Sequence, residues 1–544
     1  ANGIVIGGDG DVTSAGDIDA GGSGIRIDGN GNVDSTGDIN AANGDGIYIR
    51  GDGDVTSAGD ISAVGAGIAI WGAGDVTSEG NISANGYGIY IFGAGNVTNM
   101  GNIDAGANGI DIGTGNVDST GSITAGGHGI FIWGAGDVTS VGDITAGANG
   151  IVIGGDGDVT SAGDITADWD GIRIFGAGNV DSTGDISAAN GAGIYIWLDG
   201  NVSSTGDISA GEDGIYIFGT GNVDSKGDIS AALSGIYINS NGDVTSAGNI
   251  NAANGAGIYI GGAGDVSSTG DVTANGYGIY ILGNGNANST GDITAGGIGI
   301  YTGDGNVNSM GNITAGLYGI RIGGSGDVTS TGDISAVSDG IFIFGGGNVT
   351  NMGNIDAGSN GIDIGAGNVD STGNITAGGI GIYIDTSGNV DSEGDITAGG
   401  TGIYIWIDGN ANSTGNITAG ASGIYIGGTG DVTSVGNITA GVNGIYTGNG
   451  DVTSASNISA GGSGIVIGGS GDVTSAGNIS AGLYGIYIWI DGNVDSTGNI
   501  TAGGSGIYIG GNGDVKSAGD ITAGGTGIYV GGNGVIDVLG NVHG

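Results

Sequence analysis

The sequence predicts an all-β chain folded as a parallel β-helix (β-solenoid) of about 26 coils of about 21 residues, with three short strands per coil. Three observations predict it. The block Gly-Ile-x-Ile, or a close variant, recurs 26 times between Gly3 and Gly527, at spacings of 20, 21 or 22 residues. Each repeat also holds two further segments in which apolar and polar residues alternate. Glycine separates the segments, and none carries the periodicity of an amphipathic helix.

The first repeat shows the three expected strands in order, over residues 3–6, 11–14 and 17–20. Each is rich in β-branched residues and is bounded by glycine, which is typical of short strands. Because successive side chains of a strand point to opposite faces, alternate residues face the interior. The residues expected to point inward are Ile4, Ile6, Val12, Ile18 and Ala20, with Ser14 at a corner.

The same inward positions recur in every repeat, so we expect like side chains to stack on one another from coil to coil. One coil cannot bury its apolar face alone, but its neighbours cover it. Proline is absent, which leaves every backbone N–H available for the ladders between coils. No linker, charge block or shift in composition interrupts the repeats. The sequence therefore predicts a single continuous domain over residues 1–544.

Composition narrows the classes of function. The chain has 6 Lys and Arg against 55 Asp and Glu, a formal net charge of −49. Proteins that bind nucleic acid need cations to neutralise phosphates, so we expect no nucleic-acid partner. No apolar run approaches the roughly 18 residues of a membrane helix, so we expect no membrane insertion. Cysteine is absent, and an acidic, repetitive chain of this kind is compatible with an extracellular, secreted or cell-surface location.

One run of residues resembles known repeats. The segment Asn96-Val-Thr-Asn-Met-Gly-Asn-Ile-Asp-Ala, followed by Gly109-Ile110, resembles the passenger repeats of bacterial autotransporter adhesins. It is also similar to haemagglutinin-type β-helix repeats, and the resemblance extends over essentially the whole chain. It implies a right-handed parallel β-helix, export from the cell and a surface or adhesive role.

Columns of acidic residues are the first candidate site. Asp or Asn opens the second and third strands of most coils, which places carboxylates about 4.8 Å apart along a column. Oxygen-only clusters suit Ca²⁺, so calcium is a possible ligand although no cofactor is required. The alternative is a solvated polar face whose Asx side chains bond to local backbone. The candidate calcium ligands are Asp11, Asp17, Asp54 and Asp60.

A column of aromatic residues is the second candidate site. The middle residue of Gly-Ile-x-Ile is Tyr in 15 of the 26 repeats and points outward by alternation, and tryptophans follow the same block. Three interpretations stay open: stacking between coils that stiffens the solenoid, packing against a second rod, or stacking on sugars. The residues of this expected surface are Tyr48, Tyr90, Tyr195, Tyr216, Tyr404, Tyr529, Trp71, Trp133, Trp197, Trp406 and Trp489.

Two further residue types bear on chemistry. Thirteen Asn-x-Ser/Thr triplets occur, and each is a possible N-glycosylation acceptor in an organism that glycosylates. His128 and His543 are the only histidines, and neither lies in the spacing of a catalytic triad or a metal site. We therefore expect no enzyme. Representative acceptors are Asn81, Asn312, Asn374, Asn437 and Asn499.

The two ends of the sequence lie in the same phase of the repeat. Another copy placed directly after Gly544 would put its first Gly-Ile block 20 residues after Gly527, a spacing that the repeat already uses. This predicts head-to-tail stacking of subunits, since contacts of this kind generate open filaments. A fragment of a larger adhesin is the rival interpretation. The residues expected to meet are Ile4, Ile6 and Val12 on one side, and Val535, Ile536, Val538, Leu539 and Val542 on the other.

These features favour an extracellular structural protein that assembles with itself, head to tail and laterally, into a cell-surface or biofilm-matrix filament. The alternative is an autotransporter-like surface adhesin that binds glycans or host cell surfaces through the aromatic column. An ice-binding solenoid is a third hypothesis, because residues such as Thr13 form outward ladders.

Overall fold

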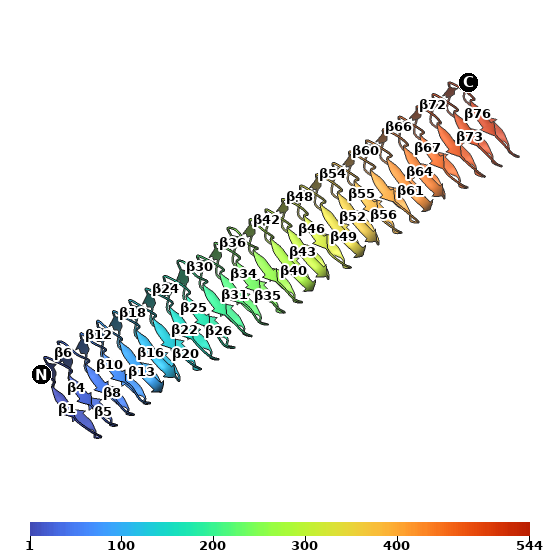
Figure 1. The fold of residues 1–544 in the computed structure, drawn as a ribbon. Coiled ribbons are helices and arrows are strands. Elements are labelled where there is room, and N and C mark those ends of the chain that lie inside the picture. Colours follow the sequence, from blue (N-terminus) through green and yellow to red (C-terminus); the bar gives the residue numbers. More distant parts are fainter. The chain divides into compact units, whose positions relative to one another are not determined.

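The computed structural model describes residues 1–544 and confirms the predicted all-β parallel β-solenoid. Its 78 strands form 26 coils of three strands, and no helix is present. The chain divides into two compact units, Ala1–Gly276 with strands β1–β39 and Tyr277–Gly544 with strands β40–β78. Each unit therefore holds thirteen coils, whose strands stack beside one another (Figure 1). A single continuous domain over 1–544 stays a prediction.

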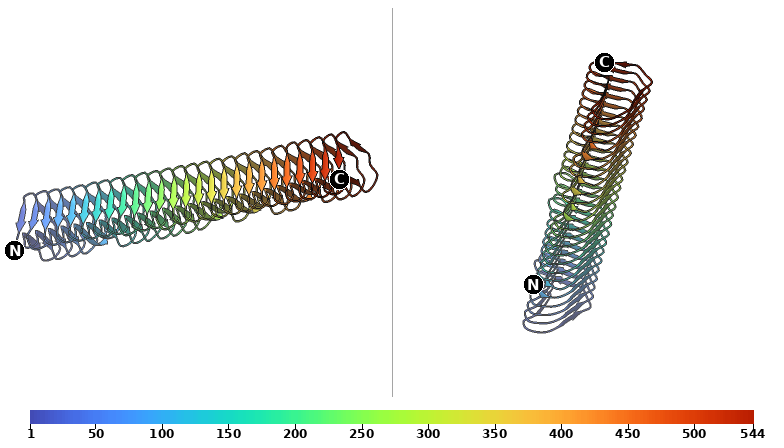
Figure 2. Two further views of the ribbon diagram at one scale, coloured as in Figure 1. Left: turned by 90° about the horizontal axis from the view of Figure 1, so that it is seen from above. Right: turned by 90° about the vertical axis from the view of Figure 1, so that its right-hand side faces the viewer.

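The first coil contains β1 (Ile4–Ile6), β2 (Val12–Ser14) and β3 (Ile18–Ala20), as the alternation predicts. Strand β1 pairs in parallel with the first strand of the next coil, so that Ile4 lies beside Ile25. The same pairing repeats along three parallel sheets in each unit (Figure 2). We call these the first sheet (Ile-x-Ile strands), the second sheet (Val-x-Ser strands) and the third sheet (Ile-x-Ala strands).

Strands of the second and third sheets span three residues throughout, apart from β78 (Val542–His543). The first sheet of unit 1 continues through β4 (Ile25–Ile27), β7 (Ile47–Ile49), β10 (Ile68–Ile70), β13 (Ile89–Ala94), β16 (Ile110–Thr114), β19 (Ile130–Ile132), β22 (Ile151–Ile153), β25 (Ile172–Ile174), β28 (Ile194–Ile196), β31 (Ile215–Ile217), β34 (Ile236–Ile238) and β37 (Ile258–Ile260). That of unit 2 contains β40 (Ile279–Asn284), β43 (Ile300–Asp304), β46 (Ile320–Ile322), β49 (Ile341–Gly346), β52 (Ile362–Ala366), β55 (Ile382–Ile384), β58 (Ile403–Ile405), β61 (Ile424–Thr429), β64 (Ile445–Asn449), β67 (Ile465–Ile467), β70 (Ile486–Ile488), β73 (Ile507–Ile509) and β76 (Ile528–Val530).

The core consists of aliphatic ladders at the predicted inward positions. In the second coil, Ile25 and Ile27 are fully buried, and so in effect is Val33. The serine of the second sheet differs from the expected corner position, because it is also inside. Ser35 is fully buried, and its Oγ donates to the Gly37 carbonyl at 3.3 Å. Alternation places Val and Ser on the same side of the strand, and the nearby turn carbonyl satisfies the hydroxyl.

Coils that are one residue shorter are accommodated at the corner after the first strand. The coil of β16 is an example: the preceding strand β13 is extended to six residues, and the register between β13 and β16 shifts between Ile91 and Ala94. Gly115 then closes the corner with φ of +123°, a conformation that L side chains rarely adopt. The coil of β52 repeats this device with Gly367, also at φ +123°.

Candidate functional site: an aromatic strip and Asx ladders

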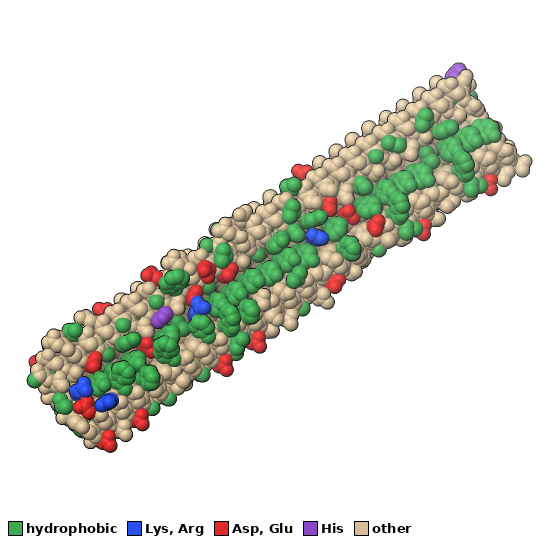
Figure 3. Space-filling model, viewed as in Figure 1, with side chains coloured by type: hydrophobic (Ala, Val, Ile, Leu, Met, Phe, Trp, Pro, Cys, Tyr) green, Lys and Arg blue, Asp and Glu red, His purple; other side chains and the backbone are tan.

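An apolar strip runs over the first sheet of each unit (Figure 3). One column of the strip is formed by the middle residue of each first-sheet strand, which points outward as predicted. A second column, which we call the outer column, is formed by the residue that follows the Ile-x-Ile block. We use the name aromatic strip for both columns. The exposed apolar members of the outer column are Trp71, Phe92, Trp133, Phe175, Trp197 and Phe218 in unit 1, and Leu282, Phe344, Trp406 and Trp489 in unit 2.

Tyrosines of the inner column stack on one another from coil to coil. In unit 1 the rings of Tyr195 and Tyr216 lie 4.9 Å apart with an angle of 6° between their planes. In unit 2 the Tyr404–Tyr425 and Tyr425–Tyr446 pairs are each 4.7 Å apart and within 10° of parallel. Rings stacked in this way cover each other's faces, so they present edges and hydroxyls to the outside. This geometry matches the stacking interpretation and removes most of the inner column as a platform for sugars.

The outer column leaves more ring surface open. Trp133 is 66 % exposed and Trp489 is 63 % exposed. In each case the equivalent residue of the following coil is glycine, Gly154 or Gly510, so no side chain from that coil can cover the indole. Where the following coil supplies an aromatic residue instead, the rings stack, as Trp197 and Phe218 do at 4.9 Å and 6°. Glycine in this column therefore decides which rings stay open.

All four arginines of the chain lie on this strip. Arg26, Arg173 and Arg321 take the middle position of first-sheet strands, and Arg50 directly follows β7. Arg173 donates to the Asp170 carboxylate at 2.8 Å, and its guanidinium lies 4.7 Å from the centre of the Tyr195 ring. Such contacts are cation–π interactions between neighbouring coils. The sequence analysis did not single out these residues, although they stand in the same column as the tyrosines.

Two aspartates interrupt the inner column, one in each unit, and the sequence analysis missed them as well. Asp111 is only 2 % exposed, yet it stands where most coils carry an outward tyrosine. Its Oδ2 accepts from Asn108 Nδ2 at 2.7 Å, and its Oδ1 accepts from Trp133 Nε1 at 2.9 Å. Burial raises the pKa of this carboxyl, and the two hydrogen bonds and the nearby His128 oppose the rise. The signal was Gly-Ile-Asp-Ile in place of Gly-Ile-Tyr-Ile.

The equivalent residue in unit 2, Asp363, has a different environment. Its Oδ2 accepts from Asn360 Nδ2 at 2.8 Å, and it is half-buried. Burial raises its pKa to about 6, the Asn360 bond opposes the rise, and the carboxylates of Asp339 and Asp385 add to it. Tyr383 donates its hydroxyl to Asp385 at 2.8 Å, and burial together with this bond raises the pKa of Tyr383 to about 12.

The four candidate calcium ligands belong to hydrogen-bonded Asx ladders. In each case an Oδ1 accepts the backbone N–H of the equivalent residue one coil later. Asp11 accepts from Asn32 at 2.8 Å and Asp17 from Asp38 at 3.1 Å. Asp54 and Asp60 accept in the same way, at 2.9 and 2.8 Å. The structure thus shows the carboxylates bonding to backbone, and it shows no group of three or more acidic or histidine side chains arranged to hold a metal ion. Calcium binding stays a prediction.

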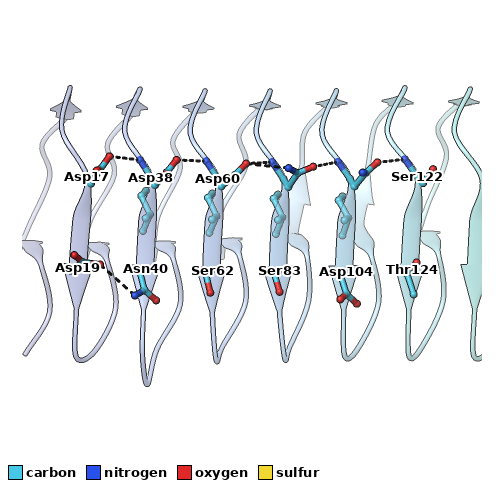
Figure 4. A pocket seen from close by; sticks show the side chains of 16 residues that line it. Asp17, Asp19, Asp38, Asn40, Asp60, Ser62, Ser83, Asp104, Ser122 and Thr124 are labelled. Atoms are coloured by element: carbon cyan, nitrogen blue, oxygen red, sulfur yellow. Dashed lines mark hydrogen bonds between the residues drawn. The ribbon is translucent and has the colours of Figure 1, made fainter.

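The third sheet of unit 1 carries a shallow polar trough of about 770 Å³ on its outer face (Figure 4). One side is the Asx ladder that begins at Asp17 and Asp38 and continues through Asp60. The other side is the outward column of the same strands, which begins with Asp19 and Asn40, joined at 3.3 Å. Its lining is hydroxyls, amides and carboxylates in register, so this face is a hydrated polar surface.

The candidate glycosylation asparagines lie in the same ladders. Asn81, Asn312, Asn374, Asn437 and Asn499 are all exposed, but their side chains take part in contacts between coils. For example, Asn81 Nδ2 donates to Asp60 Oδ1 at 3.3 Å, and Asn437 Nδ2 donates to Asn416 Oδ1 at 3.2 Å. A glycan on that nitrogen would replace the ladder bond. Glycosylation stays a prediction.

The residues predicted for head-to-tail assembly lie in the first and last coils. Ile4 and Ile6 are half-buried, whereas the equivalent Ile25 and Ile27 are fully buried, and Val12 is 6 % exposed. In the last coil Val535, Ile536, Leu539 and Val542 are exposed, and Val538 is half-buried. The structure therefore places these apolar groups at open coil faces, which another coil of the same kind would cover.

Comparison with protein-family models, with curated proteins and with solved structures finds no match to this chain. The structure has no helix of the length and hydrophobicity that crossing a membrane requires.

Proposed function

We propose that this protein is an extracellular structural protein whose coils stack head to tail, copy upon copy, into a filament of a cell surface or matrix. The observation that carries the proposal is the like-on-like register of the coils. Ile pairs with Ile, Val with Val and Ala with Ala in successive coils, as in the β1–β4, β2–β5 and β3–β6 pairs. Any coil is therefore a template for a further coil of the same sequence pattern.

Coil-on-coil addition uses the forces that hold each unit together. Every new coil brings backbone hydrogen bonds along three sheets and buries a set of aliphatic side chains, as Ile25, Val33 and Ile39 are buried. In repeat proteins the stability is approximately a sum of such neighbour contacts, so a contact between copies is equivalent to one within a copy. The net charge of −49 opposes assembly, and salt screens that repulsion.

The resemblance to autotransporter and haemagglutinin-type repeats supports export and a surface location. It also supplies the second candidate function, a surface adhesin that binds glycans or host cells. The specific observation that favours the adhesin is the outer column, because the indoles of Trp133 and Trp489 are about two-thirds exposed. In both cases we propose a mechanical or binding role without catalysis and without a required cofactor.

Electron microscopy of the purified chain tests the proposal, with salt concentration and a calcium chelator as variables. We expect filaments that lengthen with protein concentration and with salt, and whose axial spacing is the roughly 4.8 Å of stacked strands. Loss of filaments on chelation would add a role for calcium. Discrete particles at every protein and salt concentration would contradict the structural function and leave the adhesin as the better account.

A further inference from the structure

We infer that the aromatic strip is a lateral self-association surface, which packs against the aromatic strip of a second copy of this chain. The inference deepens the proposed function and rests on it, because it assigns a structural role to a face that coil stacking leaves uncovered. In each unit this face carries most of the exposed aromatic side chains, and it is continuous over the first sheet (Figure 3).

The distribution of charge selects a second copy as the partner. Two copies with a net charge of −49 each repel one another wherever their Asx ladders come close. Arg26, Arg173 and Arg321 all lie in the inner column of the strip, and Arg50 lies in its outer column. The strip is therefore the face with the least negative charge and the most apolar area, so it is where two like-charged copies approach at the lowest electrostatic cost.

The geometry of the rings also fits a second copy. Stacked tyrosines such as Tyr216 and Tyr237, 5.1 Å apart and within 4° of parallel, present one ring edge and one hydroxyl per coil. A second copy carries the same period, so its side chains stay in step with the first copy over any number of coils. Flat sheets with matched spacing pack face to face about 10 Å apart with interleaved side chains.

The available area is sufficient for a specific contact. A three-residue strand is about 10 Å long and coils are about 4.8 Å apart, so each coil offers about 50 Å² of face. Thirteen coils in one unit then bury about 600 Å² on each partner, or about 1,200 Å² in total, the lower limit for stable protein interfaces. The outer column adds to this area, and its tryptophans are the residue type that most often dominates interface energetics.

The test uses the full chain and removes two open tryptophans of unit 2, Trp406→Ser and Trp489→Ser together. These side chains are 54 % and 63 % exposed, so the fold should survive their removal. The matched control is Trp169→Ser, since Trp169 is 58 % exposed but lies in a turn after the third sheet, outside the strip. Analytical ultracentrifugation measures lateral association in solution, electron microscopy measures filament width, and circular dichroism checks the fold.

We expect the native chain and the Trp169→Ser chain to associate in pairs, more tightly at higher salt, and the double variant to associate at least tenfold more weakly. Filaments of native width in the double variant would overturn the inference, and so would native filaments that are one solenoid wide. Either result leaves the proposed function standing, whereas the absence of filaments with intact pairs would contradict head-to-tail assembly alone. Tryptophan-dependent binding of single copies to an insoluble polysaccharide would overturn the inference in favour of the adhesin.

Discussion

Two segments of nearly identical sequence, one in each unit, place the same aspartate in different surroundings. Residues 96–113 and 348–365 differ only at Ala107 and Ser359. Both contain the Gly-Ile-Asp-Ile block, and in both an asparagine three residues earlier donates to the aspartate Oδ2, at 2.7 and 2.8 Å. Asp111 is nevertheless almost completely buried, whereas Asp363 is half-buried.

The difference comes from the next coil. After Asp111, that coil supplies Trp133, whose Nε1 donates to the second carboxylate oxygen at 2.9 Å. After Asp363, the equivalent position is Asp385, which adds negative charge and accepts the hydroxyl of Tyr383 instead. A local segment thus sets the backbone and one hydrogen bond, and a residue 22 positions further along the chain decides whether the carboxylate is satisfied.

The first prediction concerns what the two segments share, and it has the largest expected effect. Gly115→Ala and Gly367→Ala should each destabilise their coil, by about 3 kcal/mol, because both glycines have φ of +123° and a Cβ would collide with a carbonyl of the preceding coil. Hydrogen–deuterium exchange with mass spectrometry on the full chain reports the local opening free energy. Clearly unequal losses would contradict the view that the shared segment behaves alike in both units.

The second prediction uses what the segments do not share. Asp111→Asn should cost about 2 kcal/mol, because two donors already point at its oxygens and one of them would face the new amide N–H₂. Asp363→Asn should stabilise its coil by about 1 kcal/mol at pH 7.5, since it removes a charge near Asp339 and Asp385 while keeping an acceptor for Asn360.

The same exchange measurement on the peptides that contain each residue checks these signs. Two changes of equal sign would show that the following coil has no influence on the aspartate.

The third prediction breaks the contrast from the side of the next coil. Trp133→Phe removes the Nε1 donor but keeps an aromatic ring, so the coil of Asp111 should lose about 1.5 kcal/mol of protection. Trp406→Phe is the matched control, because Trp406 stacks beside Tyr404 at 6.0 Å and follows a coil that carries Tyr383 rather than aspartate. Equal losses in the two variants would assign the effect to the ring and exclude the hydrogen bond.

The fourth prediction is a pH dependence in unit 2 only. The pKa of Asp363 is raised from 3.8 to about 6, so the protonated form is the one the fold favours. The stabilisation is complete below about pH 4 and is lost as the pH rises through 6. We expect a loss of about 1 kcal/mol, a figure reduced for solvent screening at a half-buried site.

Exchange rates of the peptide around Asp363, corrected for the intrinsic pH dependence, measure this loss. The Asp363→Asn chain should show none of it, and a similar loss in that chain would assign the effect to another group. Grafting the partner of Asp111 into unit 2, as Tyr383→Phe with Asp385→Trp, should lower the pKa of Asp363 towards its ordinary value. A pKa that stays near 6 in the grafted chain would contradict the role given to Trp133.

The sequence by itself determined the fold class, the number of coils, the three strands of each coil and the faces of most side chains. It could do so because the alternation of apolar and polar residues is local, and a repeat multiplies the same local signal 26 times. Ile4, Val12 and Ile18 were assigned inward on this basis, and Tyr48 and Trp71 outward, and the structure agrees for each.

Only the tertiary structure decided which side chains meet across coils. Partners such as Asp111 and Trp133, or the stacked rings of Tyr195 and Tyr216, are separated by 21 or 22 residues. Which atoms face each other then depends on how each corner absorbs coils of 20, 21 or 22 residues. The turn carbonyl that accepts from Ser35 and the N–H that donates to Asp11 likewise come into reach only when the coil closes. Contacts of this kind depend on register between coils, and alternation along one strand carries no information about that register.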